Sequence, residues 1–517
     1  MAKTIILKDN QTIPNREQEQ QPNEDKIFPL NRKERDLFRY LSDHSLLDLR
    51  DENDNSVLVF SQSFDETQDG FGDSYVLHYI DDDVAQSIIT NNRVGFIGYK
   101  STDTRTDIHI RIRSRFSFDG NESKDSKGKN NKDKGKDYFL YYMLEKVLAV
   151  NMMSLMTSSS KEDSVFDLMF LFFPKLLKEA VAQGLYKQYV HREYNDANVR
   201  GTIDINRHIR YNIPFNGRVA YRTREFSYDN PVTQLIRHTI EFIRRKPFGK
   251  AVLHNDPDTE GCVQQIIQAT SAFQPRQKQS VINDNLRSFA HPYFTKYAAL
   301  IKLCLAILRQ EKLAYGQNKE QQVYGVLIDA AWLWEEYVAG VINSIGGNHY
   351  TRKNSGYKLF KEEDRDNKKF QKIIPDYLSP GNDEEKNDWV ADAKYIPLNE
   401  EQNRQLSADR AGAIYYKTIM YMYRFNTDVG FLLHPVKPEE DASANVVTSL
   451  TYNIPGGRGG KLHKVGIVIP QPGNDMDYSA FKKEMQEKRE KAFVNEIKRC
   501  GKEEAFVNEI NAFLTTT

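Results

Sequence analysis

The chain has 517 residues, of which 39% are hydrophobic and 11% aromatic, so two or three globular domains are expected and a disordered protein is excluded. Basic and acidic residues balance at 72 each, which excludes strong DNA binding through overall charge and leaves only local or partner-shared contacts. Three scattered cysteines exclude a disulfide framework and a zinc site and indicate a reducing compartment.

Neither a signal-peptide pattern nor a membrane span is present in the sequence. The most apolar stretch, residues 165–173, is followed by Pro174 and Lys175. It is far shorter than the roughly 20 apolar residues that a spanning helix needs. We therefore expect a cytoplasmic protein without membrane contact.

Residues 1–120 predict a β-rich domain with one helix at residues 32–41. Runs of β-forming residues lie at 56–60, 75–80, 94–99 and 108–116. In the last run three isoleucines alternate with His109, Arg111, Arg113 and Arg115. The basic face is either solvated or a surface that meets phosphate or an acidic partner.

Residues 121–137 contain no apolar residue and predict a flexible linker. From residue 138 the hydrophobic period becomes helical, which predicts a helical middle region over residues 138–320. Its helices are expected at 138–156, 164–183, 231–245, 260–273 and 290–310.

Arginine residues are interleaved with Tyr, Phe and His between the second and third of these helices. This composition suits contact with nucleic-acid phosphates and stacking on bases, and it equally suits ordinary surface salt bridges. The candidate DNA-binding residues are Arg207, Arg210, Arg222 and Arg224.

A helix is predicted over residues 325–343, and Gly346 and Gly347 follow it as C-terminal glycines do. Helical spacing places Glu335 beside apolar residues and Glu336 on a more polar face. An unpaired carboxylate in an apolar environment is costly, so we expect Glu335 to be paired with a cation or to lie at the edge of the core.

The segment 373–395 predicts a β-hairpin, because two short apolar runs flank a polar stretch of turn composition. Asp376 lies in the first run and Asp392 and Lys394 in the second. Asp392 and Lys394 are two residues apart and therefore share one face of a strand. Similar D-x-K or E-x-K strings at residues 125, 366 and 384 lie in linker or turn composition instead.

Two carboxylates and one ammonium group at one end of a hairpin suit a nuclease. Asp376 and Asp392 would hold Mg²⁺, which prefers one or two carboxylates together with water and phosphate oxygens. Lys394 would orient or help deprotonate the attacking water and offset charge on phosphorus, and Glu335 would complete the metal shell. The nuclease core is expected over residues 321–475.

A helix at 407–425 and strands at 429–434 and 465–470 complete a mixed α/β core. The tail, residues 476–517, predicts a peripheral charged helix in which the string A-F-V-N-E-I occurs at Ala492 and again at Ala505. No nucleotide-binding P-loop, zinc-protease or serine-hydrolase motif is present.

Several strings together resemble the McrC-type nuclease subunits of McrBC- and LlaJI-like bacterial restriction systems. The resemblance covers residues 140–435 and is carried by strings at residues 184–189, 199–209, 333–338, 374–377, 390–395 and 421–435. It implies a PD-(D/E)xK endonuclease core with Glu335, Asp376, Asp392 and Lys394 at the catalytic positions. One departure is that Lys417 stands where related nucleases often carry Gln, four residues before a Tyr.

The resemblance also implies a separately encoded McrB-like AAA+ GTPase oligomer, which the N-terminal part of the chain would engage, and double-stranded DNA as substrate. The expected function is therefore Mg²⁺-dependent DNA cleavage within a GTP-driven phage-defence complex. Two alternatives remain: a non-cutting subunit that activates a AAA+ motor, and a stand-alone repair nuclease.

Overall fold

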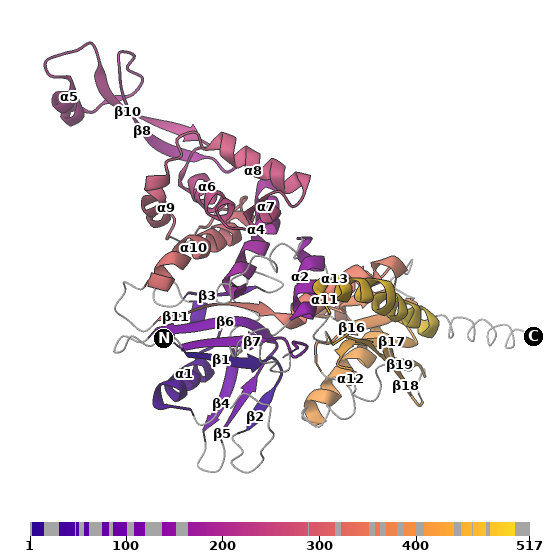
Figure 1. Ribbon diagram of the computed structural model, residues 1–517. Coiled ribbons are helices and arrows are strands. Elements are labelled where there is room, and N and C mark those ends of the chain that lie inside the picture. Colours follow the sequence, from indigo (N-terminus) through magenta and orange to yellow (C-terminus); the bar gives the residue numbers. More distant parts are fainter. Residues whose placement is uncertain are drawn as a thin grey trace, which may run out of the picture.

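The computed structural model describes residues 3–14, 30–46, 48–50, 56–60, 75–81, 86–100, 108–118, 137–150, 164–287, 289–315, 322–350, 357–361, 369–379, 387–396, 398, 408–438, 446–456, 459–471 and 476–501. They form an N-terminal β domain, a helical body with a projecting arm, and a C-terminal sheet flanked by helices (Figure 1). This is the mixed α/β architecture predicted. The predicted linker, except Asp137, and the second A-F-V-N-E-I copy lie outside the described residues.

The N-terminal domain contains two sheets and a helix. The larger sheet has the order β1-β7-β6-β11-β3, with bounds β1 Lys3–Lys8, β3 Ser56–Phe60, β6 Arg93–Lys100, β7 Ile108–Arg113 and β11 Gln322–Asp329. The smaller sheet has the order β2-β5-β4, with bounds β2 Thr12–Pro14, β4 Leu77–Asp81 and β5 Gln86–Thr90. Helix α1 (Arg32–Asp43) begins at a capping box and packs against β4, and a 3-10 turn η1 spans Asp48–Arg50.

Strand β11 corrects the predicted helix over residues 325–343. Residues 325–329 pair with β6 and β3 in the N-terminal sheet, and the helix α11 begins only at Ala330. At Gly325 an added Cβ would lie 2.2 Å from the Phe96 carbonyl oxygen, so close strand pairing requires glycine there. A strand from beyond residue 320 thus completes the N-terminal sheet, across the predicted domain boundary.

The basic residues of β7 correct a second expectation. Ile108, Ile110 and Ile112 are buried as predicted, but Arg113 and Arg115 are also buried, with 6% and 7% of their surface exposed. Arg115 donates a hydrogen bond of 2.9 Å to the carbonyl oxygen of Tyr395 and lies over its ring. At this end the basic face is therefore neither solvated nor open to phosphate. It is the contact between the N-terminal domain and the C-terminal sheet.

The helical body packs around α10, which contacts α4 and α6. Its helices are α2 Tyr138–Leu148, α4 Ser164–Ala182, α6 Pro231–Arg244, α7 Gly249–Leu253, α8 Pro257–Ala269, the 3-10 turn η2 Pro275–Gln277, α9 Lys278–Asp284 and α10 Lys296–Tyr315. Gly184, at φ +97°, follows α4 as predicted, and Asn230 caps α6. Among the described helices, none is both long and apolar enough to cross a bilayer.

An arm of three strands and a short helix projects from this body (Figure 1). It comprises β8 Gln188–Asp196, β9 Thr202–Ile203, α5 Ile205–Asn212 and β10 Val219–Ser227. Strand β10 pairs with both β8 and β9, and α5 lies at the far end. The predicted helical region thus contains a β arm that its composition did not indicate.

The C-terminal sheet has the order β12-β15-β16-β17-β19-β18. Its strands are β12 Asn348–His349, β15 Tyr377–Leu378, β16 Val390–Ala393, β17 Val429–Val436, β18 Val447–Asn453 and β19 Lys461–Val468, and a small hairpin beside it joins β13 Lys358–Lys361 to β14 Lys369–Lys372. Its helices are α11 Ala330–Ile342 with the 3-10 turn η3 Asn343–Ile345, α12 Ala408–Arg424, α13 Tyr478–Glu484 and the π-helical turn η5 Met485–Arg489, which continues as helix to residue 501.

Parallel pairing in the centre of this sheet determines where the predicted site residues lie. Strands β16 and β17 are parallel, so the chain between them must cross over, and α12 makes that crossover and packs on both strands. Every residue of β17 is buried, as expected of a central strand covered on both faces. The residues that end β16 therefore lie beneath α12.

Candidate active site

The predicted hairpin is confirmed. Strands β15 and β16 are antiparallel, with Tyr377 opposite Ala391 and Leu378 opposite Val390. Asp376 immediately precedes β15, Asp392 is the third of the four residues of β16, and Lys394 follows the strand. Antiparallel pairing therefore brings the start of one strand beside the end of the other, and Asp376, Asp392 and Lys394 come together.

Asp392 is a fully buried carboxylate between two ammonium groups. Its side chain has 0% exposure; Lys394 forms an ion pair with Oδ2, and the Nζ of Lys417 lies 3.6 Å from Oδ1. Burial alone would raise the pKa of Asp392, but the positive charges of Lys394 and Lys417 outweigh it and hold the pKa below its ordinary value. Asp392 is therefore ionised at neutral pH.

Asp376 is the second carboxylate of the pair. Its Oδ2 accepts a hydrogen bond of 2.7 Å from the backbone N–H of Ala393, next to Asp392. Burial and the negative charge of Asp392 raise the pKa of Asp376 well above its ordinary value. Two carboxylates held this close repel each other, so the pair favours a cation between them.

Lys394 is fixed at its backbone and remains charged at its tip. Its N–H donates a hydrogen bond of 2.8 Å to the carbonyl oxygen of Leu433 in β17. Burial acts to lower the pKa of the ammonium group, but the charges of Asp392 and Asp376 raise it overall. The side chain keeps 21% exposure, so the ammonium can be reached from solvent.

Glu335 and Glu336 are both half-buried but have different neighbours. The Oε1 of Glu335, on α11, lies 2.9 Å from the Nε2 of His349, which extends β12 beside the hairpin. Burial acts to lower the pKa of His349, but its hydrogen bond with Glu335 and the charges of both glutamates raise it. The expected cationic partner of Glu335 is thus His349.

Glu335 does not join the two aspartates as a third ligand in this structure. Across the described residues, no group of three or more His, Cys, Asp and Glu side chains is arranged to hold a metal ion. Glu335 nevertheless lies near enough that its charge helps to raise the pKa of Asp376. The structure therefore brings Asp376 and Asp392 together and leaves Glu335 beside them, held by His349.

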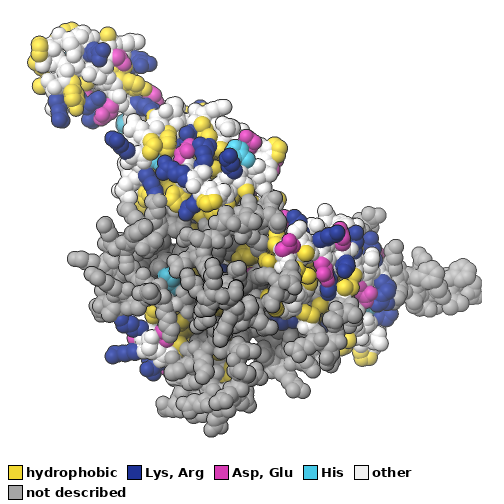
Figure 2. Space-filling model, viewed as in Figure 1, with side chains coloured by type: hydrophobic (Ala, Val, Ile, Leu, Met, Phe, Trp, Pro, Cys, Tyr) yellow, Lys and Arg dark blue, Asp and Glu magenta, His cyan; other side chains and the backbone are white. Residues whose placement is uncertain are grey.

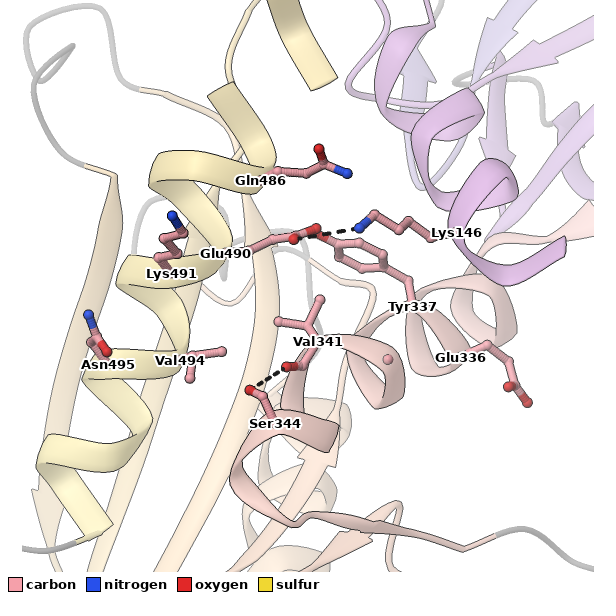
Figure 3. Close-up of a pocket in the computed structure, with 11 residues that line it drawn as sticks. Lys146, Glu336, Tyr337, Val341, Ser344, Gln486, Glu490, Lys491, Val494 and Asn495 are labelled. Carbon is pink, nitrogen blue, oxygen red and sulfur yellow. Dashed lines mark hydrogen bonds and ion pairs between the residues drawn. The ribbon is translucent and has the colours of Figure 1, made fainter. Parts of the chain in front are cut away.

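Glu336 lines the edge of a different feature, a pocket of about 420 Å³ between α11, α2 and the C-terminal helix, and its carboxylate points away from the centre (Figure 3). At the centre of the pocket lies Glu490. Its carboxylate accepts hydrogen bonds from the hydroxyl groups of Tyr142 and Tyr337 and lies 3.9 Å from the Nζ of Lys146. Glu490 is thus neutralised within the fold, and the pocket lies apart from the aspartate pair.

Helix α12 presents Lys417 and Tyr421 to the site. The hydroxyl group of Tyr421 donates a hydrogen bond of 2.6 Å to the carbonyl oxygen of Ile374, two residues before Asp376. The helical spacing of Tyr416, Ile419, Met420 and Tyr423 predicts an apolar stripe on this helix, but the stripe is largely exposed, with Tyr416 at 72% and Tyr423 at 74%. The buried face of α12 is instead the one that carries Thr418, Tyr421 and Met422.

The four arginines predicted to bind DNA lie on the arm. Arg207 and Arg222 both pair with Glu193, at 3.4 and 3.3 Å, and Arg222 also pairs with Asp204. Arg224 lies over the ring of Tyr189, and Arg210 over that of Tyr211. The arm is thus a mixed surface of basic and apolar side chains (Figure 2), and binding of DNA to it remains a prediction.

Sequence reasoning missed two contacts of this site. Nothing local links His349 to Glu335, because the contact depends on the pairing of a two-residue strand with β15. The contact of Arg115 with Tyr395 joins residues 280 positions apart. Lys417 carried a signal, because it lies one helical turn before Tyr421 on the helix after the D-x-K string.

The fold and site define a multidomain α/β protein in which a buried aspartate, a half-buried aspartate and two lysines meet at one end of the β15–β16 hairpin. Residues 88–435 match the family described as McrBC 5-methylcytosine restriction system component, and because the match covers more than half of the chain, the protein belongs to this family. A comparison with curated proteins gave no match.

Two solved structures from Thermococcus gammatolerans are similar to the chain. A half-complex from a tetradecameric assembly of McrB AAA+ hexamers with bound McrC aligns over 94% of this chain and 99% of its own, at 16% identity and a TM-score of 0.41. A chain of the McrBC complex aligns over 66% of this chain and 87% of its own, at 14% identity and a TM-score of 0.25.

Proposed function

We propose that this chain is the DNA-cleaving subunit of its restriction system and hydrolyses phosphodiester bonds with Mg²⁺. The observation that carries the proposal is the convergence of Asp376, Asp392 and Lys394 at one end of the β15–β16 hairpin. The six-stranded sheet with α11 and α12 would then be a PD-(D/E)xK endonuclease core. Membership of a restriction-system family supports the same reading.

The donor atoms fit Mg²⁺. Asp376 and Asp392 supply two carboxylates, and the Ala393 carbonyl adds a hard oxygen between Asp392 and Lys394. When bound, the ion would polarise the scissile phosphate and lower the pKa of a water molecule. Glu335 would contribute to the metal site either through a water molecule or by breaking its hydrogen bond with His349.

Lys394 would act as an ammonium group. The two aspartates raise its pKa, so it donates hydrogen bonds to the attacking water and the phosphate rather than accepting a proton. Its backbone hydrogen bond to Leu433 fixes its base on the central strands, which limits the movement of the side chain to its tip.

The partner in this proposal is an McrB-like AAA+ GTPase oligomer, and the arm supplies a contact surface for it. Large apolar side chains at the tip are exposed, with Ile205 at 66%, Ile213 at 64% and Phe215 at 69%. Exposed apolar clusters of this kind mark protein interfaces. The predicted contact through the N-terminal domain would be additional.

The test uses the chain with its GTPase partner, GTP, Mg²⁺, and DNA with and without 5-methylcytosine. Wild-type protein should cut DNA, and Asp392→Ala should abolish cutting while GTPase stimulation persists. If the assembled wild-type complex cuts neither DNA, the nuclease assignment is wrong. The chain would then be a non-cutting subunit that activates the AAA+ motor. Cutting by the chain without partner or GTP would instead identify a stand-alone nuclease.

A further inference from the structure

Two lysines, rather than one, contact the buried Asp392. Lys394 follows the same strand and pairs with Oδ2, whereas Lys417 comes from α12, and its Nζ lies 3.6 Å from Oδ1. Asp392 alone needs only one ammonium group for neutrality, and the charge of Asp376 also acts on Lys417. Charge balance does not explain why the Lys417 side chain stays 43% exposed beside Oδ1 of Asp392.

The two lysines differ in their access to solvent. The side chain of Lys417 is 43% exposed, twice the exposure of Lys394 at 21%. A separation of 3.6 Å exceeds the roughly 2.7–3.2 Å of a nitrogen–oxygen hydrogen bond, so Lys417 is attracted to Asp392 without being tied to it. An ammonium group has three donors, and the 43% exposure of the Lys417 side chain leaves room for a second contact.

Tyr421 sets the position of Lys417. One turn further along α12, its ring lies 5.3 Å from the Lys417 ammonium, and its hydroxyl group is bonded to Ile374. Tyr421 is 2% exposed, so its ring is held in place by the surrounding side chains. The stem of Lys417 is thereby fixed beside the segment that leads into Asp376, while the charged tip remains accessible.

The charges change when a divalent cation lies between the two aspartates. Such a cation would satisfy Asp392 and weaken the attraction that draws Lys417 to Oδ1. The nearest remaining anion would then be the phosphodiester of the substrate. Lysine is well suited to such a contact, because it binds phosphate as a compact point charge.

We propose that Lys417 is a second catalytic lysine, which moves from Asp392 to a non-bridging oxygen of the scissile phosphate when DNA and the divalent cation bind. This inference rests on the proposed nuclease function. Lys394 would then orient the attacking water, and Lys417 would stabilise the negative charge that develops on the phosphate. The competing explanation is structural, with Lys417 serving only to neutralise a buried carboxylate.

The test compares Lys417→Met, which keeps the length and removes the charge, with Lys417→Arg in the assembled complex. Lys498→Met is the matched control, because Lys498 is an exposed lysine on the C-terminal helix. DNA affinity is measured over a range of salt concentrations with Ca²⁺ in place of Mg²⁺, Mn²⁺ affinity is measured without DNA, and cleavage is measured with Mg²⁺.

We expect Lys417→Met to reduce kcat by about 10²–10³-fold. We expect the slope of log affinity against log salt to fall by about 0.9, as for one lost phosphate contact. Mn²⁺ affinity should be unchanged or higher, because a competing positive charge is gone. Lys417→Arg should recover part of the cleavage, and Lys498→Met should match wild type.

A purely structural role gives the opposite pattern: Lys417→Met would lose Mn²⁺ affinity and thermal stability, with an unchanged salt slope. That pattern, or cleavage at the wild-type rate, overturns the inference while wild-type cutting still upholds the nuclease assignment. If wild-type protein itself does not cut, the proposed function fails first, and the inference fails with it.

Discussion

The C-terminal sheet and the arm place their charged and aromatic residues in opposite environments. In the sheet, Asp392 is fully buried and pairs with Lys394, whose backbone is hydrogen-bonded to the central strand β17. On the arm, Arg222 pairs with Glu193 while both side chains are more than half exposed, and Phe215 lies largely in solvent. The sheet therefore buries its charged groups in a fixed arrangement, whereas the arm leaves its charged and apolar side chains exposed for contact.

The largest expected effect is the loss of cleavage in Lys394→Ala. Removing the ammonium group beside Asp392 should lower kcat by at least about 10²–10³-fold, because no other described side chain occupies its place on Oδ2. Mn²⁺ binding should persist, since both aspartates remain. Cleavage kinetics and calorimetry check this, with Lys483→Ala, at an exposed lysine of α13, as control. Cutting at the wild-type rate would contradict the assignment.

The second prediction compares the same change, Phe to Ala, in the sheet and on the arm. Phe431, in β17, is fully buried and contacts Trp389 and His463, whereas Phe215 is 69% exposed. Phe431→Ala should lower the free energy of unfolding by about 3–5 kcal/mol. Phe215→Ala should change it by less than about 0.5 kcal/mol and should weaken partner binding instead. Denaturant unfolding and partner titration would separate the two, and equal stability losses would contradict the contrast.

The smallest effect is expected for Arg224→Ala on the arm. Its contact with the exposed ring of Tyr189 should contribute no more than about 1 kcal/mol, and less at high salt. Thermal unfolding at two salt concentrations measures this. If the same variant leaves DNA affinity unchanged in the complex, the predicted DNA contact of the arm is wrong.

The hairpin and its residues could be predicted because turn composition and strand alternation are local signals. Strand β11 could not be separated from α11, because an uninterrupted apolar run suits a buried strand and a helix equally. A cue was nevertheless present at Asp329, whose side chain accepts hydrogen bonds from the N–H groups of Ala331 and Trp332 and so starts α11. The arm escaped prediction because β8 and β10 have no fully buried face to impose alternation.

The contact of Arg115 with Tyr395 has a mechanical consequence. Tyr395 is the next residue after Lys394. Arg115 donates a hydrogen bond to its carbonyl oxygen and lies over its ring, and its hydroxyl group lies 3.3 Å from that of Ser114. One peptide unit thus separates Lys394, the proposed catalytic lysine, from the residue that the N-terminal domain contacts. A small rotation of that domain on docking would displace Lys394 relative to Asp376, and shifts of about 1 Å at a reacting centre change rates by about 10²-fold. Assembly and cutting would then be coupled through this one contact.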